Sequence, residues 1–500
     1  MPHQLSTDCL DEILEHLEND KTILHSCLLV NRLWCKISVR ILWRNIWRFK
    51  YIVYREQHPL EVASSILSTL VACLPNESKE LLYKNKIFIP TPTSKPPLFN
   101  YVTFCKVLSI CEIIKLVENV LRNEPSNINS SLSLKDKNSL VTNEVFKMFT
   151  NQIPSLKKLT YDYNQFIPKF SFTYFPGARD LLELRCSSDI PAEFFYQLSQ
   201  ICNNLQIIFI EFRSDDVSNE LKELISLQNN LKSLTLIASV SSWANFIPAL
   251  TKLSNTINTI TKLHLYGNNY NLPLSFVSLF TNLEEIIFSF DYGADFGDFK
   301  ILQFANFPNL QILKFPQRYP KPEYLMKFLE INGKNLKTFY TYGSDNSLSS
   351  SIADFCPNLK NLFIGINHGE INTLKTIFNS CQYLESIKIW CGKSYSGEER
   401  TYLSEKEVFE TVTNHSPSNF CELKIYYISN SDFVSPEDLE SFFINWKNRV
   451  PKKLLRLIIN KNNNIEVNEE NKKIAEKYEN LGIIKFSIEA FYDEDIFYLL

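Results

Sequence analysis

The sequence predicts an α/β solenoid, a right-handed coil with parallel strands on its inside and helices on its outside. Two observations support this prediction. An apolar motif returns at intervals of about 25 residues through the C-terminal two thirds of the 500-residue chain. The segments between successive motifs carry apolar residues at helical spacing. Stacked repeats of one strand and one helix are the architecture that such a period indicates.

The motif is L-x-x-L-x-L, with other apolar residues allowed at its three positions. The last two positions point to one face of a short strand, while the residue between them points outward. Such a unit cannot bury its apolar face alone, so neighbours stack around one core. The spacing is typical of a leucine-rich-repeat horseshoe, with about thirteen repeats in 151–490 and insertions near 390–419 and 426–453. The first apolar positions are Leu156, Leu181, Leu205, Leu231, Ile260, Leu283, Leu310, Leu336, Leu359, Leu384, Phe420, Leu454 and Leu481.

The connecting segments agree with this architecture. Residues Ser218–Leu227 and Pro322–Glu330 have the apolar spacing of helices. Asparagine often directly precedes the first apolar position, which suits a turn from helix to strand. Cysteine stands three residues before that position at 202, 356 and 381. These cysteines are candidate metal ligands or redox thiols, but free cysteine behaves as a small buried hydrophobe, so packing at the corner is the favoured interpretation.

Residues 49–150 are predicted to form a helical linker and N-terminal cap of the repeats. Loops are expected near 90–97, which is rich in proline, and over 124–138, which is rich in Ser, Asn and Lys. Between them, Phe104–Leu121 has the spacing of an amphipathic helix. The last ten residues, 491–500, are an acidic-aromatic tail.

Residues 1–48 are predicted to form a small all-α module of three helices. Thr7 or Asp8 is expected to cap the first helix, and the second and third helices are expected to begin after Asp20 and Asn31. Three short helices bury only a modest core, so apolar side chains remain for a partner. The first helix places four apolar residues on one face: Leu10, Ile13, Leu14 and Leu17.

The module also has an opening leucine, a valine before a short polar step and a tryptophan in its last helix. In this combination it resembles an F-box, in the form common in fungal F-box proteins with C-terminal leucine-rich repeats. One position departs from the family pattern, because Ser6 follows Leu5 where many F-boxes have proline. The residues that match, and that the resemblance implies as adaptor-binding, are Leu5, Leu10, Ile13, Leu14, Leu17, Leu24, Leu28, Val30 and Trp34.

The resemblance implies a substrate receptor of an SCF-type ubiquitin ligase. The F-box would dock on a Skp-type adaptor, which is bound to a cullin scaffold with a RING subunit, and the repeats would hold a target protein for ubiquitylation. The chain would be non-catalytic and need no cofactor, because it supplies proximity. The alternative is a repeat scaffold with no ligase role, whose module caps the array. The two differ in whether Leu10, Leu14 and Trp34 face outward or are buried against the first repeats.

Alternation along each strand places residues two, four and six after the first apolar position on the concave surface. Exposed aromatic residues beside Lys and Arg are frequent in protein-binding hot spots, so the stretch from Tyr340 to Tyr426 is the predicted target face. The alternative is that some of these rings pack under the long insertions. The predicted target-binding residues are Tyr266, Tyr340, Tyr342, Phe363, Lys388, Trp390, Lys424 and Tyr426.

Composition and motifs argue against other functions. The net charge of -3 does not favour nucleic-acid binding. The sequence lacks glycine-rich phosphate loops, C-x-x-C pairs and signatures such as H-E-x-x-H, so neither a metal site nor an active site is predicted. No catalytic motif includes His264, His368, His415 or Cys391. No signal peptide or membrane helix is predicted, which indicates a cytoplasmic or nuclear protein with reduced cysteines.

Overall fold

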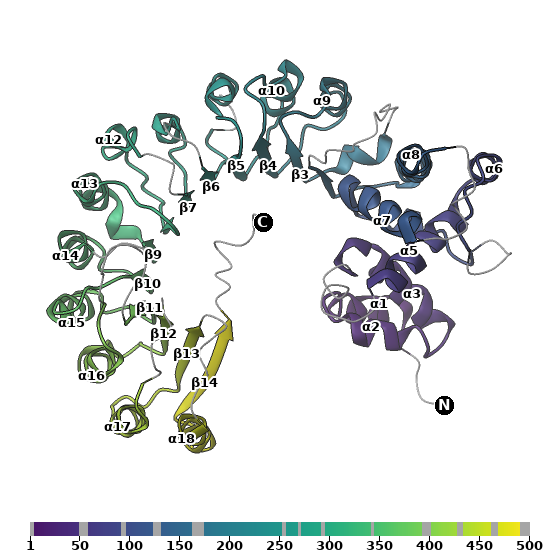
Figure 1. Cartoon of the computed structure of the whole chain (residues 1–500). Coiled ribbons are helices and arrows are strands. Elements are labelled where there is room, and N and C mark those ends of the chain that lie inside the picture. The colour runs from purple at the N-terminus through teal and green to yellow at the C-terminus, as the bar shows by residue number, and fades with distance from the viewer. Residues whose placement is uncertain are drawn as a thin grey trace. The chain divides into compact units, whose positions relative to one another are not determined.

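A computed structural model describes residues 5–49, 59–91, 97–123, 132–162, 175–252, 257–268, 272–291, 296–341, 345–392, 402–427, 434–461 and 469–490. The chain divides into two compact units, Met1–Leu231 and Lys232–Leu500. In each unit parallel strands pair in sequence order, and helical segments connect them (Figure 1). This is the leucine-rich-repeat α/β solenoid that the motif predicts. None of the described helices is long and apolar enough to cross a lipid bilayer.

The first unit starts with helices and continues into the first strands. Its strands pair in the order β1 (Val107–Ser109), β2 (Lys158–Tyr161), β3 (Glu183–Ser187) and β4 (Ile207–Phe212). Its helical segments are α1 (Thr7–Glu15), α2 (Lys21–Cys27), α3 (Arg32–Trp43), η1 (Ile46–Phe49), α5 (Pro59–Cys73), α6 (Asn76–Lys84), η2 (Tyr101–Phe104), α7 (Ile110–Asn123), α8 (Leu134–Gln152), η4 (Pro176–Asp180), α9 (Ala192–Ser199) and α10 (Asn219–Ser226).

In the second unit, the larger helices α13–α18 lie together on one side of the strands (Figure 1). The strands are β5 (Ser233–Ala238), β6 (Lys262–Gly267), β7 (Glu285–Phe290), β8 (Ile312–Phe315), β9 (Thr338–Thr341), β10 (Asn361–Ile364), β11 (Ser386–Cys391), β12 (Glu422–Tyr427), β13 (Leu455–Lys461) and β14 (Ile484–Ala490). The helical segments are η5 (Ala244–Phe246), α11 (Ile247–Thr251), η6 (Ser275–Leu279), α12 (Phe299–Leu302), α13 (Pro322–Asn332), η7 (Gly333–Asn335), α14 (Asn346–Phe355), α15 (Ile371–Ser380), α16 (Glu405–His415), α17 (Pro436–Lys447) and α18 (Glu469–Asn480).

The motif sets where the strands begin. Each strand from β2 to β12 starts two residues after the first apolar position, and those positions, Leu156 through Phe420, are fully buried. The last two are an exception, because Leu454 is 53% exposed and Leu481 is 56% exposed. In β13 the neighbouring Leu455 takes the core position and pairs in register with Ile484. The assignment of Leu454 and Leu481 to the core is therefore wrong.

The segment predicted as one helix over Phe104–Leu121 is a strand followed by a helix. Cys105, Leu108 and Ile110 are fully buried and have the spacing of the repeat motif, with cysteine at its first position. The strand β1 begins two residues after Cys105, as in the later repeats, so the helix starts only at Ile110. The predicted loop over 124–138 extends too far, because its last residues belong to a helix. Ser133 accepts a hydrogen bond from the Asp136 amide and caps α8, which begins at Leu134.

The turns between repeats are tied by asparagine, and the cysteines pack beneath them. The side-chain amides of Asn282, Asn335 and Asn358 each donate to a carbonyl of the preceding turn, at 2.7–2.9 Å. Cys202, Cys356 and Cys381 are fully buried, and burial raises the pKa of the Cys202 and Cys381 thiols to about 12. Thiols held neutral in this way are poor metal ligands and nucleophiles, which supports the packing interpretation.

Candidate functional site

Helices α1, α2 and α3 form a module with an apolar core of its own. Leu10, Leu14 and Leu24 are buried in this core with Cys27, Ile37 and Ile41, and Trp34 packs against it. The two alternatives for Leu10 and Leu14, outward-facing or buried against the repeats, are both wrong. The apolar face of α1 is instead used within the module, where it packs with residues of α2 and α3.

Polar side chains fix the ends of these helices. The helices α2 and α3 begin after Asp20 and Asn31, as predicted, and these residues cap them by accepting hydrogen bonds from the amides of Ile23 and Trp34 at 3.0 Å each. The N-cap of α1 is Ser6, which accepts from the Cys9 amide, and the prediction of Thr7 or Asp8 was one or two residues late. Ser6 therefore supplies the capping oxygen that begins α1.

Ion pairs hold α3 against α1. Arg40 contacts Asp11 at 2.6 Å, and Arg44 forms a two-pronged pair with Glu15. The hydrogen bond from Arg44 lowers the pKa of Glu15 from its ordinary value. These pairs lie at the margin of the module, and they orient α3 more than they stabilise it, because exposed pairs contribute little.

The module leaves several apolar side chains exposed. Of the nine predicted adaptor-binding residues, Leu5, Ile13 and Val30 are exposed by 56%, 48% and 57%. Leu17, Leu28 and Trp34 are half-buried, and the other three belong to the core. Leu29 is 83% exposed and was missed, although the apolar run Leu28–Val30 directly after α2 was a visible signal. These exposed apolar side chains are available for contact with a partner.

The end of the module also covers the edge of β1. The Arg44 carbonyl accepts from the amides of Lys106 and Val107 at 2.9 and 3.1 Å, just as the Lys106 carbonyl accepts from the next repeat. The Trp47 indole donates to the Val107 carbonyl at 2.9 Å. The chain after α3 thus occupies the place of a preceding repeat and caps the edge of β1.

The predicted target face contains a buried aromatic cluster. Tyr340, Phe363, Trp390 and Tyr426 pack together with Tyr402, and each is exposed by only 2–3%. The Tyr340 and Phe363 ring centroids lie 4.2 Å apart, and those of Trp390 and Tyr426 lie 5.2 Å apart. The prediction that these rings are exposed is wrong, and the alternative of packing under an insertion describes them.

The cover comes from the insertion after β11. The Tyr402 amide donates a hydrogen bond to the Gly392 carbonyl at 2.9 Å, and Tyr402 forms an antiparallel bridge with Asn367. The Leu403 amide donates a hydrogen bond to the Ile366 carbonyl. This backbone holds the Tyr402 side chain against the cluster, beside the strand ends. Alternation along a strand could not reveal this contact, because it depends on residues far along the chain.

The remaining residues of the predicted face are polar or half-buried. Lys388 and Lys424 are register partners on β11 and β12, and the Lys388 ammonium lies 5.7 Å from the Tyr340 ring centroid. Tyr266 is half-buried, with its ring centroid 6.5 Å from that of His264. Tyr342 lies outside the described residues. Lys388 and Lys424 therefore supply positive charge beside the aromatic cluster.

His264 takes part in an ion-pair network, whereas Cys391 lies in the core. His264 contacts Glu285 at 3.1 Å and Lys262 contacts the same carboxylate at 3.0 Å. The pKa of Glu285 is lowered to about 2, mainly by the hydrogen bond from His264. Cys391 is fully buried, and burial raises the pKa of its thiol. Within the described ranges no three His, Cys, Asp or Glu side chains could together hold a metal ion.

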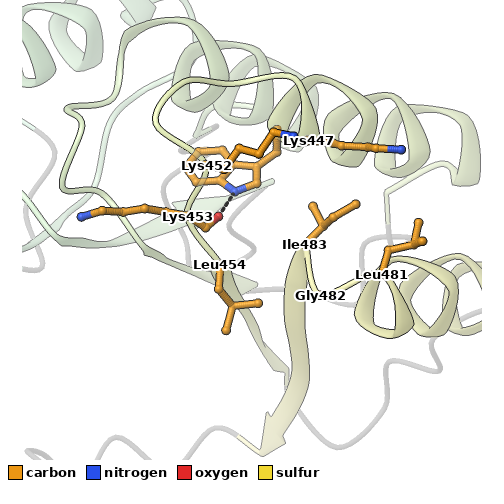
Figure 2. A pocket seen from close by; sticks show the side chains of 8 residues that line it. Lys447, Lys452, Lys453, Leu454, Leu481, Gly482 and Ile483 are labelled. Atoms are coloured by element: carbon orange, nitrogen blue, oxygen red, sulfur yellow. Dashed lines mark hydrogen bonds between the residues drawn. The ribbon is translucent and has the colours of Figure 1, made fainter.

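A pocket lies where the last two repeats meet, between the end of α17 and the turn before β14. Its lining includes Leu454, Leu481 and Ile483, beside the Trp446 indole, which donates to the Lys453 carbonyl at 2.9 Å. Figure 2 shows the ammonium ends of Lys447 and Lys453 pointing away from one another.

Comparison with known proteins gives only distant likenesses. No protein-family model matches the chain, and no curated protein matches its sequence. Among solved structures, the leucine-rich repeat-containing protein LegL7 from Legionella pneumophila is similar with a TM-score of 0.34 and 15% identity, over 61% of this chain and 95% of that one. A chain of the Rad7 and Elc1 complex in yeast is similar with a TM-score of 0.36 and 12% identity, over 94% and 96%. At these values neither likeness bears on function.

Proposed function

We propose that this chain is a target receptor of an SCF-type ubiquitin ligase, with the helical module as the adaptor-binding part and the repeats as the target-binding part. The observation that carries the proposal is a self-contained helical module with exposed apolar residues, joined to a leucine-rich-repeat solenoid. The F-box resemblance of residues 5–43 supplies the identity of the partner, a Skp-type adaptor, and through it a cullin and a RING subunit.

The adaptor contact is assigned to Leu5, Ile13, Leu29 and Val30, which are exposed by 48–83%. Burying such side chains against a partner stabilises a complex by removing apolar area from water. Leu10, Leu14 and Leu24 act indirectly, because they form the core that holds the exposed residues in place. The chain brings a target close to the conjugating enzyme and supplies no catalytic group of its own.

A second candidate function is a repeat scaffold without a ligase role. The contacts of Arg44 and Trp47 with the edge of β1 favour this function, because a module that served only as a cap would make the same contacts. Capping and adaptor binding use different surfaces of the module, so the first does not exclude the second.

Co-purification with a Skp-type adaptor separates the two functions. We expect the full chain to bind stoichiometrically, and the combined variant Ile13→Asp, Leu29→Asp and Val30→Asp to lose binding while keeping its circular dichroism and melting temperature. The matched control is Ile301→Asp on α12, which changes a residue that is 60% exposed but lies in the other unit. If the unmodified chain does not bind any Skp-type adaptor, the scaffold function replaces the ligase function.

A further inference from the structure

The strand β14 is the last of the described strands. It pairs with β13 on one side, and among the described residues no strand pairs with its other side. The opposite end of the array differs, because Arg44 and Trp47 cover the edge of β1. An unpaired strand edge is a template for pairing with another strand.

The hydrogen-bonding groups on this edge can be assigned. The Leu455 amide donates to the Ile483 carbonyl, so Ile483 and alternate residues after it face β13. The backbone groups of Ile484, Phe486 and Ile488 therefore face outward, because successive residues of a strand point to opposite sides. In agreement, the Phe486 amide donates to the Glu479 carboxylate at 2.7 Å and not to a strand. The exposed Glu479 side chain is the outward partner that an incoming strand would displace.

The sequence of β14 complements itself about Ser487. In an antiparallel pair centred there, Lys485 lies opposite Glu489, and Phe486 lies opposite Ile488. Lys485 and Glu489 are exposed, and at about 13 Å apart along one strand they cannot pair with each other within one chain. Ile488 is 36% exposed and Phe486 is half-buried, so the same pairing covers apolar surface.

The hydrogen-bond pattern agrees with this centre. Directly opposite residues of an antiparallel pair exchange both of their hydrogen bonds or neither. Phe486 and Ile488 both have outward-facing backbone groups, so they form the bonded pair. Shifting the centre to Phe486 or Ile488 keeps this geometry but separates Lys485 from Glu489. Only the centre at Ser487 satisfies charge, apolar contact and hydrogen bonding together.

We propose that β14 pairs antiparallel with β14 of a second copy of this chain, about a two-fold axis at Ser487. The occupant is the same chain because the strand is complementary to itself. An interface of this small size predicts a weak dimer, with a dissociation constant roughly in the micromolar range. The proposal does not depend on adaptor binding, and each dimer would carry two target faces, which raises avidity for a multivalent target.

Sedimentation velocity of the full chain from about 1 to 100 µM tests the proposal. We expect a concentration-dependent dimer that Lys485→Glu weakens at least tenfold, since two attractive pairs become two repulsive ones. Combining Lys485→Glu with Glu489→Lys should restore the parent affinity to within a few-fold. Lys473→Glu, which changes an exposed lysine on α18, is the matched charge control.

Two further variants probe the backbone pairing. Ile488→Pro removes an outward-facing donor and leaves the bonds to β13 intact, so it should abolish the dimer without loss of fold. Glu479→Ala frees the Phe486 amide and should tighten the dimer. A chain that stays monomeric at every concentration overturns the proposal, as does a dimer that survives both Lys485→Glu and Ile488→Pro.

Discussion

Replacing Leu14 with alanine is expected to unfold the helical module, whereas replacing its neighbour Ile13 is expected to leave the module folded. Leu14 is fully buried in a core of six residues, and Ile13 is 48% exposed. A buried Leu→Ala change costs about 2–5 kcal/mol, and a small helical unit has little more stability than this. The exposed Ile13→Ala change should cost no more than about 0.5 kcal/mol.

The ion pairs between α1 and α3 cannot offset the loss at Leu14. Arg40–Asp11 and Arg44–Glu15 join side chains that are 24–39% exposed. Pairs of this kind contribute about 0.2–1 kcal/mol each, so together they remain below the cost of the cavity. The balance therefore predicts local unfolding of residues 5–49 in the Leu14 variant.

Hydrogen exchange measured by mass spectrometry on the full chain is the assay, because it reports on the module separately from the repeats. Peptides from residues 5–49 should lose protection in Leu14→Ala and keep it in Ile13→Ala. Adaptor binding should fall in both, through unfolding in the first and lost contact in the second. A Leu14→Ala module that stays protected yet no longer binds the adaptor would refute the reasoning, since Leu14 would then be a contact residue.

Three other predictions concern the repeats. Asn332 is buried, and its side chain accepts from the Phe307 amide at 2.7 Å and donates to the Ala305 carbonyl at 2.9 Å. Asn332→Ala should therefore lower the free energy of unfolding in urea by about 2–4 kcal/mol, whereas Asn335→Ala, at an exposed position, should lower it by under 1 kcal/mol. Leu455→Ala should lower stability by about 2–5 kcal/mol and Leu454→Ala by under 0.5 kcal/mol; equal losses would contradict the register of β13. The pKa of Glu285 is lowered to about 2, so its contribution to stability is complete above its ordinary value of 4.5 and is lost as the pH falls toward 2. Glu285→Gln should therefore be less stable than the parent at neutral pH, by a difference that shrinks on acidification; a constant difference in urea midpoints would show that the carboxylate charge is not involved.

The proposed target-binding role must rest on residues other than the aromatic cluster. Tyr340, Phe363, Trp390 and Tyr426 have almost no surface to offer, because Tyr402 packs with them. Lys388 and Lys424 remain at the surface beside them, in register on neighbouring strands. Substituting the rings would disturb packing as well as contacts, so the two lysines are the cleaner positions for testing target binding.

The sequence alone determined the repeat architecture and most of its register. A strand alternates its side chains locally, so L-x-x-L-x-L gives both the core face and the starting residue of β2 through β12. The polar residues Asp20 and Asn31 likewise marked the starts of α2 and α3, because capping is a contact over three residues. The one strand that was missed, β1, has Cys105 in place of the expected leucine.

Only the tertiary structure decided which apolar residues are available to partners. Helical spacing placed Leu10, Ile13 and Leu14 on one side of α1, but packing of α2 and α3 buried two of them and left Ile13 outside. Alternation placed Phe363 and Trp390 on the concave face, but it could not predict that Tyr402 would pack against them. Exposure depends on contacts between residues distant in sequence, whereas periodicity records only the direction in which a side chain leaves its own backbone.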